Sequence, residues 1–361
     1  MSTSADRRKL RVGVVFGSRS VEHEVSIVTA LQVIHSFDRS KYDVVPIYIT
    51  KDGQWLTGES LARIESYKDL KLIASASRAV LGPEPGERAL VARSAGLLGR
   101  QARFDLDVVF PCVHGTYGED GTLQGLLELA DIPYVGAGVV GSAVGMDKIV
   151  MKAAFRAAGI PTVRYLHFNR SRWRQQPDIV VAEVESALRY PLFVKPANLG
   201  SSIGISKATD REGLIGALEV AAQYDRRLLV EESAEGAIEI NCSVLGNDEP
   251  MASVCEQPVA WQEFLSYEDK YLRGGKGQSQ GMKSAQRRIP APISDDLTRK
   301  VQEIAVAAFR AVDCAGIARV DCLVREATGE VLVNEINTIP GSMSFYLWEA
   351  SGVPFPQLLD R

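Results

Sequence analysis

The stretch FVKPANLGSSIG, residues 193–204, joins a short apolar run to a loop of small residues. The apolar run ends at Lys195, and the loop behind it contains Gly200, Ser201 and Ser202, which have almost no side-chain bulk. A loop of this composition lets its backbone N–H groups approach a bound group closely, and phosphate is the most common such group. The stretch therefore predicts a buried strand that brings a lysine to a phosphate-binding loop.

The chain around this loop predicts a small antiparallel sheet. RYPLFVKP (residues 189–196) and RRLLVEES (residues 226–233) are both apolar runs of strand length. A helix is expected before them, from Ser142 to Ala158, and Gly159-Ile160-Pro161 ends it. We assign residues 137–238 to this second unit of the chain.

The N-terminal part of the chain, residues 1–136, alternates strands with helices. This alternation is typical of a doubly wound parallel α/β sheet, which binds ligands beyond the C-terminal ends of its strands. Lys51-Asp52-Gly53 reads as a hairpin turn, whereas residues 58–104 are interpreted as an insertion. The expected strands are LRVGVVFG (10–17), YDVVPIYIT (42–50) and LDVVFPCVHG (106–115), and the expected helices are residues 21–36 and 122–130.

The third unit, residues 239–361, carries the strongest chemical signal. Asp321 lies in the expected strand ARVDCLV, while Glu335 and Asn337 lie two residues apart, hence on one face, in VLVNEIN. Three hard oxygen ligands with few imidazoles suit Mg²⁺ bound together with a nucleotide phosphate. The apolar flanks of the strand favour this interpretation over a solvated sheet face, because a buried carboxylate without a partner is costly.

Arg319 shares the face of Asp321, where a cation can bind a phosphoryl group or a developing oxyanion. A plain ion pair between Arg319 and a carboxylate is the alternative. The same unit contains a polar stretch, residues 267–288, and an expected helix, residues 296–312.

Composition argues against several classes of protein. The chain has 361 residues, 46% of them hydrophobic and 24% charged, and its net charge of −4 makes a polyanion an unexpected main partner. No run of about 18 apolar residues predicts a membrane span, and the polar start MSTSADRRKL does not resemble a signal peptide. Five cysteines without a CxxC pair predict reduced, buried thiols in a cytoplasmic protein. The final PQLLDR reads as the middle of a helix, which predicts a slightly truncated chain.

Two common nucleotide-binding motifs are rejected. GAGVVG, residues 136–141, matches GxGxxG, but the acidic residue that a dinucleotide fold needs about 20 residues later is missing. No GxxxxGK[ST] sequence occurs, which excludes a Walker-type P-loop. The loop that follows Lys195 is therefore a phosphate loop of another type.

Weaker signals lie at the strand ends of the N-terminal unit. Glu22 begins a helix, where an acid can either favour the helix dipole or hold a substrate ammonium group. His114 ends a strand and can be either a packed histidine or a substrate contact, and residues 118–121 can form an ordinary turn with an N-cap. Each of these signals is weak alone.

Taken in order, the motifs resemble the D-alanine–D-alanine ligase family of the ATP-grasp superfamily, over nearly the whole chain. The resemblance implies three domains, in which two antiparallel sheets sandwich ATP next to the N-terminal α/β domain. It also implies a cytoplasmic homodimer that serves peptidoglycan precursor synthesis and binds neither nucleic acid nor membrane. The segments that carry the resemblance are GSRSVEHEVS, HGTYGEDGTLQG, MDK, FVKPANLGSSIG, SYEDKY, ARVD and NEINTIPG.

The resemblance assigns ATP and metal contacts by motif. Lys148 of MDK and Lys195 match lysines on the nucleotide phosphates, and Ser202 belongs to the flap that closes over them. Glu239 matches the acid on the ribose hydroxyls and Glu231 lies in the adenine-contacting strand, with the alignment between these two left open. Two Mg²⁺ ions, replaceable by Mn²⁺, are implied at Asp321, Glu335 and Asn337.

In the implied reaction, ATP phosphorylates the carboxylate of one D-alanine, and the amine of a second attacks the acylphosphate to give dipeptide, ADP and phosphate. A lid must exclude water, because an acylphosphate hydrolyses easily. The resemblance places Glu22, Ser201 and Tyr271 at the first ammonium group, and Arg319 with the Gly341 N–H at the oxyanion. Further substrate contacts are implied for His114, Lys270, Tyr346 and Leu347.

The resemblance leaves open which molecule is the acceptor, that is, the second substrate. Tyr271 matches the dipeptide-forming type, since ligases that make D-alanyl-D-lactate typically have a histidine there. Tyr346, however, stands near the place of a family serine that helps to hold the acceptor carboxylate. D-serine, D-lactate or another amine are therefore the alternatives to D-alanine. A nucleotide-binding regulator without catalysis is the alternative class, and the retained cationic and metal-binding residues argue against it.

Overall fold

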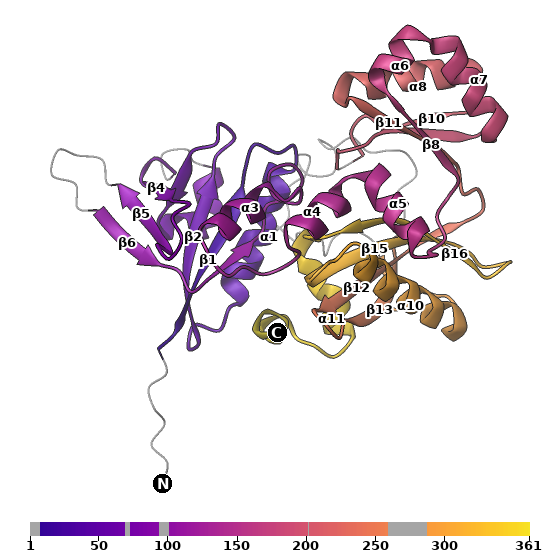
Figure 1. Ribbon diagram of the computed structural model, residues 1–361. Helices are drawn as coiled ribbons and strands as arrows, with labels where there is room; N and C mark the ends of the chain where they lie inside the picture. Colours follow the sequence, from indigo (N-terminus) through magenta and orange to yellow (C-terminus); the bar gives the residue numbers. More distant parts are fainter. Residues whose placement is uncertain (1–7, 69–72, 94–100, 201, 259–286) are drawn as a thin grey trace.

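The computed structural model describes residues 8–68, 73–93, 101–200, 202–258 and 287–361. These residues form three sheets of seven, four and five strands, each with its own helices. Figure 1 shows the N-terminal sheet on one side and the other two sheets, one above the other, on the opposite side. Each predicted unit holds one sheet, except that the third sheet begins one residue earlier, at Ile238. The predicted boundaries themselves stay predictions.

The N-terminal sheet is parallel in one part and antiparallel in the other. Its strand order is β6-β5-β4-β3-β2-β1-β7, and β1 pairs in parallel with both β2 and β7. The parallel strands and their two helices confirm the α/β prediction for this region. They are β1 Leu10–Gly17, β2 Tyr42–Ile49, β7 Val108–Pro111, α1 His23–Ser36 and α3 Thr122–Leu129.

The segment 58–104, which was interpreted as an insertion, contributes to three antiparallel strands that extend the sheet. The predicted hairpin turn joins β2 to β3 (Trp55–Thr57), with Ile49 opposite Trp55. Short strands with alternating burial give only a weak signal in a sequence, and pairing with a neighbouring strand decides whether they form. The added strands are β4 Ser77–Leu81, β5 Ala89–Arg93 and β6 Gln101–Asp105, after the short 3₁₀ helices η1 Glu59–Ala62 and η2 Ile64–Tyr67.

The second sheet surrounds the opening stretch as predicted. Its order is β10-β9-β11-β8, all antiparallel, and the small-residue loop joins β9 to β10. Figure 1 shows α6, α7 and α8 on the side of this sheet that faces away from the third sheet. The elements are β8 Tyr165–Asn169, α6 Arg170–Gln175, α7 Pro177–Ala187, β9 Leu192–Pro196, β10 Ser206–Ala208, α8 Arg211–Tyr224 and β11 Arg227–Glu232.

Two helices, and not the single predicted one, lead into this sheet. They are α4 (Val139–Met146) and α5 (Lys148–Ala157), and the chain is extended between them at Asp147. The Asp147 carboxylate accepts hydrogen bonds from the amides of Ile149 and Val150, so it caps α5. This break places Lys148 in the first turn of a helix.

The third sheet has the order β14-β13-β12-β15-β16, with antiparallel pairing throughout. The helix α10 covers its outer side (Figure 1). Both strands predicted to carry the metal ligands are present, and most of the polar stretch 267–288 lies outside the described residues. The elements are β12 Ile238–Gly246, β13 Met251–Pro258, β14 Arg287–Arg288, α10 Asp295–Ala311, β15 Gly316–Arg325 and β16 Glu330–Asn337.

The C-terminal segment returns to the N-terminal sheet. After β16 come η4 (Gly341–Ser344), α11 (Phe345–Ala350) and α12 (Phe355–Asp360). Met343 and Trp348 belong to the same hydrophobic core as the buried residues of β1 and α1. The N-terminal and C-terminal units therefore share one core, and the loop that contains Gly341 lies at this shared boundary.

All five cysteines are free and buried, as the sequence predicted. None of the described helices is long and apolar enough to cross a membrane.

Candidate active site

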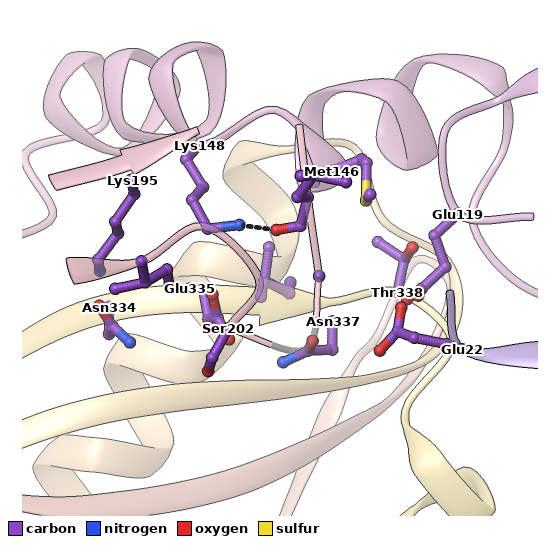
Figure 2. Close-up of a pocket in the computed structure, with 15 residues that line it drawn as sticks. Glu22, Glu119, Met146, Lys148, Lys195, Ser202, Asn334, Glu335, Asn337 and Thr338 are labelled. Atoms are coloured by element: carbon purple, nitrogen blue, oxygen red, sulfur yellow. Dashed lines mark hydrogen bonds between the residues drawn. The ribbon is translucent and has the colours of Figure 1, made fainter. Parts of the chain in front are cut away.

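A cavity of about 140 Å³ lies where the three units meet. Figure 2 shows Lys148 and Lys195 on one side of it, Asn334, Glu335 and Asn337 on the other, and Glu22 with Glu119 at one end. The site thus combines two cations with an acidic and amide-bearing strand. The remaining lining residues are Gly145, Met146, Leu199, Gly200, Ser202, Ile205, Ile336 and Thr338.

Lys148 is held by the small-residue loop. Its backbone amide donates to the carbonyl of Ala197, and its Nζ donates to the carbonyl of Leu199 at 2.7 Å. The lysine and the loop are therefore positioned by each other. Ser202, in the same loop, is exposed, has a left-handed φ of 59° and lines the cavity.

Lys195 belongs to a buried group of three charges. Its Nζ lies 2.6 Å from Glu231 Oε2, and Lys152 Nζ lies 2.8 Å from Glu231 Oε1. Burial opposes the charge on Glu231, but the two ammonium groups lower its pKa to about 2. Burial likewise opposes the charge of Lys195, but Glu231 raises the pKa of this lysine. Glu231 therefore keeps Lys195 protonated while it faces the cavity.

Sequence reasoning missed Lys152. The residue lies in α5, is 1% exposed, and its Nζ also reaches the carbonyl of Asn334 at 3.4 Å. A lysine in a helix usually points to solvent, so only its spacing of four residues from Lys148, on the same helix face, could have indicated an inward position. The role of Glu231 at adenine stays a prediction, and what the structure describes is its pairing with two lysines.

The predicted metal ligands converge on one face. Across β15 and β16, Asp321 is opposite Glu335, and Arg319 is opposite Asn337. Arg319 binds Asp321 through two hydrogen bonds, of 2.6 and 2.7 Å, and Asn337 Nδ2 donates to Asp321 Oδ2 at 3.0 Å. The ion pair that was weighed as an alternative for Arg319 is therefore present.

The donor set fits a divalent cation. Asp321 is 4% exposed, and burial together with the charge of Glu335 raises its pKa although Arg319 opposes the shift. Desolvation and the charge of Asp321 also raise the pKa of Glu239 to about 7. The face therefore carries more negative charge than one guanidinium balances. Because Asn337 uses its amide N–H₂ on Asp321, its carbonyl oxygen stays available as a third hard ligand.

Glu22 lies at the end of the cavity against two glycines. A Cβ added to Gly200 would lie 2.6 Å from Glu22 Oε2, and one added to Gly115 would lie 2.5 Å from the same atom. The small-residue loop of the second unit thus touches the carboxylate of the N-terminal unit. Glycine at position 200 is explained by this close approach.

Gly200→Ala is expected to lower kcat/KM about tenfold or more, because the new methyl group displaces the Glu22 carboxylate or the loop. Gly216→Ala is the matched control: in α8 an added Cβ meets no atom within 4 Å. The control should keep wild-type kinetics and gain up to about 1 kcal/mol of stability. Steady-state kinetics of both variants test this, and equal kinetics would contradict the contact.

Glu119 is a second site residue that the sequence did not single out. It accepts hydrogen bonds from the amides of Gly115 at 2.7 Å and Ile339 at 3.0 Å. Burial and the nearby charge of Glu22 raise its pKa to about 8. Its segment was interpreted as an ordinary turn, and only the fold brings Ile339 to it.

His114 does not line the cavity. It is 3% exposed, and its ring nitrogens are bonded to Thr29 and to the carbonyl of Ile339, both at 2.8 Å. Burial lowers its pKa to about 4. The histidine therefore holds the chain just before Gly341, and its predicted contact with substrate is not tested by this arrangement.

The hydroxyl proton of Tyr346 is already used in a hydrogen bond within the protein. Its Oη donates to Glu256 Oε1 at 3.0 Å, and the Arg287 guanidinium lies 4.0 Å above its ring. A carboxylate can only accept hydrogen bonds, so the same proton cannot also bind an acceptor carboxylate. Leu347 is fully buried in α11. Three further predicted residues, Ser201, Lys270 and Tyr271, lie outside the described residues.

Two family models match the sequence of this chain. Residues 11–137 match the model described as D-ala D-ala ligase N-terminus, and residues 154–361 match the model described as D-ala D-ala ligase C-terminus. The second match alone covers more than half of the chain.

Individual relatives agree with the models. D-alanine–D-alanine ligase of Ruminiclostridium cellulolyticum is 46% identical over 98% of this chain and 94% of that protein, and that of Natranaerobius thermophilus is 43% identical over 98% and 93%. Among solved structures, the D-alanine-D-alanine ligase from Coxiella burnetii has a TM-score of 0.80 at 36% identity, covering 98% of this chain and 92% of that one. The VanG D-Ala:D-Ser ligase from Enterococcus faecalis has a TM-score of 0.83 at 32% identity, covering 98% of both chains. The chain belongs to the D-alanine–D-alanine ligase family.

Proposed function

We propose that this protein joins two D-alanines into D-alanyl-D-alanine at the expense of ATP, for peptidoglycan precursor synthesis. One observation carries the proposal: Lys148 and Lys195 face Glu335 and Asn337 across a cavity that Glu22 closes at one end. Cations opposite hard oxygen ligands suit a nucleotide phosphate with its metal, and a carboxylate at the end suits a substrate ammonium group.

The reaction transfers the γ-phosphoryl group of ATP to a carboxylate oxygen of the first D-alanine and releases ADP. The amine nitrogen of the second D-alanine then forms a bond to the carbonyl carbon, and the bond to phosphate breaks. Lys148 and Lys195 hold the transferring phosphates, while the small-residue loop covers them and excludes water. The acceptor must lose a proton from its ammonium group before or during the attack.

The acidic strand face holds the metal in this proposal. Asp321, Glu335 and Asn337 are the ligands for Mg²⁺, with two ions expected and Mn²⁺ as a substitute. When bound, Mg²⁺ neutralises the charge that develops on the phosphoryl oxygens. Arg319 is fixed by Asp321 beside this face, where its remaining N–H groups and the Gly341 amide stabilise the tetrahedral oxyanion.

We further propose the cytoplasm as the compartment and a homodimer as the assembly. Free, buried thiols at all five cysteines agree with a reducing compartment. The dimer is supported by the family resemblance alone, and gel filtration with light scattering tests it.

Product analysis tests the proposed function. Phosphate release is measured with D-alanine, ATP and Mg²⁺, and the product is identified by mass spectrometry. The same assay then offers D-alanine, D-serine and D-lactate together at pH 6 and pH 8. D-alanyl-D-alanine should dominate at both pH values. D-serine is included because the Tyr346 hydroxyl is already bonded to Glu256 and because the chain is similar in structure to the VanG D-Ala:D-Ser ligase. D-alanyl-D-serine as the main product would support this alternative acceptor. Absence of any ligated product would refute the proposal.

A further inference from the structure

The loop after β16 has an unusual backbone. Ser342, Met343 and Ser344 have consecutive left-handed φ angles of 54°, 51° and 46°. Residues other than glycine rarely adopt this region, and a run of three persists only where the surrounding structure holds it. The loop directly follows Gly341, so whatever holds it also sets the direction of the Gly341 amide.

Two side chains of the N-terminal unit hold this loop. The Ser342 amide donates to Thr29 Oγ1 at 3.0 Å, Thr29 Oγ1 lies 2.8 Å from His114 Nε2, and His114 Nδ1 lies 2.8 Å from the Ile339 carbonyl. Both side chains are almost completely buried, at 1% and 3% exposure.

Only one arrangement of protons satisfies these bonds. A carbonyl accepts, so His114 Nδ1 carries the hydrogen that binds Ile339. Burial keeps the imidazole neutral by lowering its pKa to about 4, which leaves Nε2 as an acceptor for the Thr29 hydroxyl proton. The Thr29 oxygen in turn accepts from the Ser342 amide, and each donor and acceptor in this series of hydrogen bonds is used once.

Two sets of hydrogen bonds hold this loop. Its own backbone closes a turn from Pro340 to Met343, because the Met343 amide donates to the Pro340 carbonyl at 2.8 Å. The N-terminal unit holds the residues on either side of Pro340 and Gly341, since Thr29 accepts from the Ser342 amide and His114 donates to the Ile339 carbonyl. Gly341 lies inside the turn, and no acceptor for its amide is found among the residues that the structure describes.

We infer that Thr29 is a positioning residue for the reaction: its hydroxyl fixes the Ser342 amide and thereby aims the Gly341 amide at the oxyanion. The inference rests on the proposed function, because Gly341 acts on an oxyanion only if the chain performs this ligation. Thr29 lies outside the cavity and acts through the loop, as a link from the N-terminal unit to the C-terminal one.

The test compares Thr29→Val, which keeps the shape and removes the hydroxyl, with Thr29→Ser, which keeps the hydroxyl. Thr29→Val should lower kcat about 10- to 100-fold and leave KM for ATP and D-alanine within about threefold, because a small misplacement affects the transition state most. Thr29→Ser should restore kcat to within about threefold of wild type. Thr57→Val is the matched control: Thr57 is also buried, at 4% exposure, and its hydroxyl donates to the Pro46 carbonyl in the N-terminal sheet.

A second readout is independent of activity. Hydrogen–deuterium exchange of the peptide that covers residues 339–345 should be faster in Thr29→Val than in wild type, and unchanged in Thr57→Val. Wild-type kcat in Thr29→Val, or an equal kcat loss in Thr57→Val, would overturn the inference. If wild type forms no ligated product, the proposed function fails, and the exchange data then show separately whether Thr29 holds the loop.

Discussion

Glu335→Gln is expected to lower kcat by about 10²–10³-fold, the largest effect among the activity predictions. The variant keeps the shape of the side chain but removes the charge of a residue that we propose as a metal ligand beside the transferring phosphoryl group. A metal at such a place supplies several kcal/mol of transition-state stabilisation, and each 1.36 kcal/mol corresponds to a factor of ten in rate. Glu335 lies directly opposite Asp321 and lines the cavity, so the lost charge is at the proposed metal site.

The measurement is phosphate release at a series of Mg²⁺ concentrations. Glu330→Gln is the matched control, because Glu330 lies on the same strand but pairs with Arg325 away from the cavity. The control should stay within about twofold of wild type, since exposed ion pairs contribute little. Near-normal turnover of Glu335→Gln at saturating Mg²⁺ would remove the metal assignment.

Glu231→Gln is expected to lower the free energy of unfolding by about 3–5 kcal/mol at pH 7, the largest effect on stability. The variant leaves Lys152 and Lys195 buried side by side without their shared carboxylate, and an unpaired buried charge is costly. KM for ATP should rise as well, because Lys195 can then lose its proton. Glu232→Gln is the neighbouring control: Glu232 is 22% exposed and pairs with Arg164 at 3.3 Å, so its loss should cost less than about 1 kcal/mol.

The effect of Glu231 depends on pH in a defined direction. Its pKa is about 2 in the folded protein against an ordinary 4.5, so its stabilisation is complete above pH 4.5 and is lost as the pH falls toward 2. Urea unfolding at pH 7, 5 and 3.5 should therefore show a stability difference between wild type and Glu231→Gln that shrinks only at the lowest pH. A difference that stays constant across this series would mean that Glu231 is not an ionised partner of the two lysines.

Local patterns in the sequence determined most of the elements and the strand face that we propose as the metal site. Val12–Phe16 is an uninterrupted apolar run, so a buried parallel strand follows from the residues themselves. Glu335 and Asn337 share a face because side chains alternate along any strand, and the small residues after Lys195 predicted a loop that lines the cavity. These predictions needed no knowledge of distant contacts.

Tertiary structure decided the features that depend on pairing between distant segments. Three short segments, 77–81, 89–93 and 101–105, became strands because the edge of the sheet accepted them, a choice that alternating short segments do not make alone. The break at Asp147 followed from a cap that also binds Arg227, 80 residues further along the chain. Without knowledge of this contact, the sequence predicted a single helix from Ser142 to Ala158.

The electrostatic and positioning parts of the site were likewise beyond the sequence. Lys152, Glu119 and Thr29 each occur in segments that read as an ordinary helix or turn, and none belongs to a motif that names its partner. Their partners, Glu231, Ile339 and Ser342, are 79, 220 and 313 residues away along the chain. Periodicity reports which side of an element is buried, but the charge or carbonyl that a buried polar group meets is set by the packing of one unit on another.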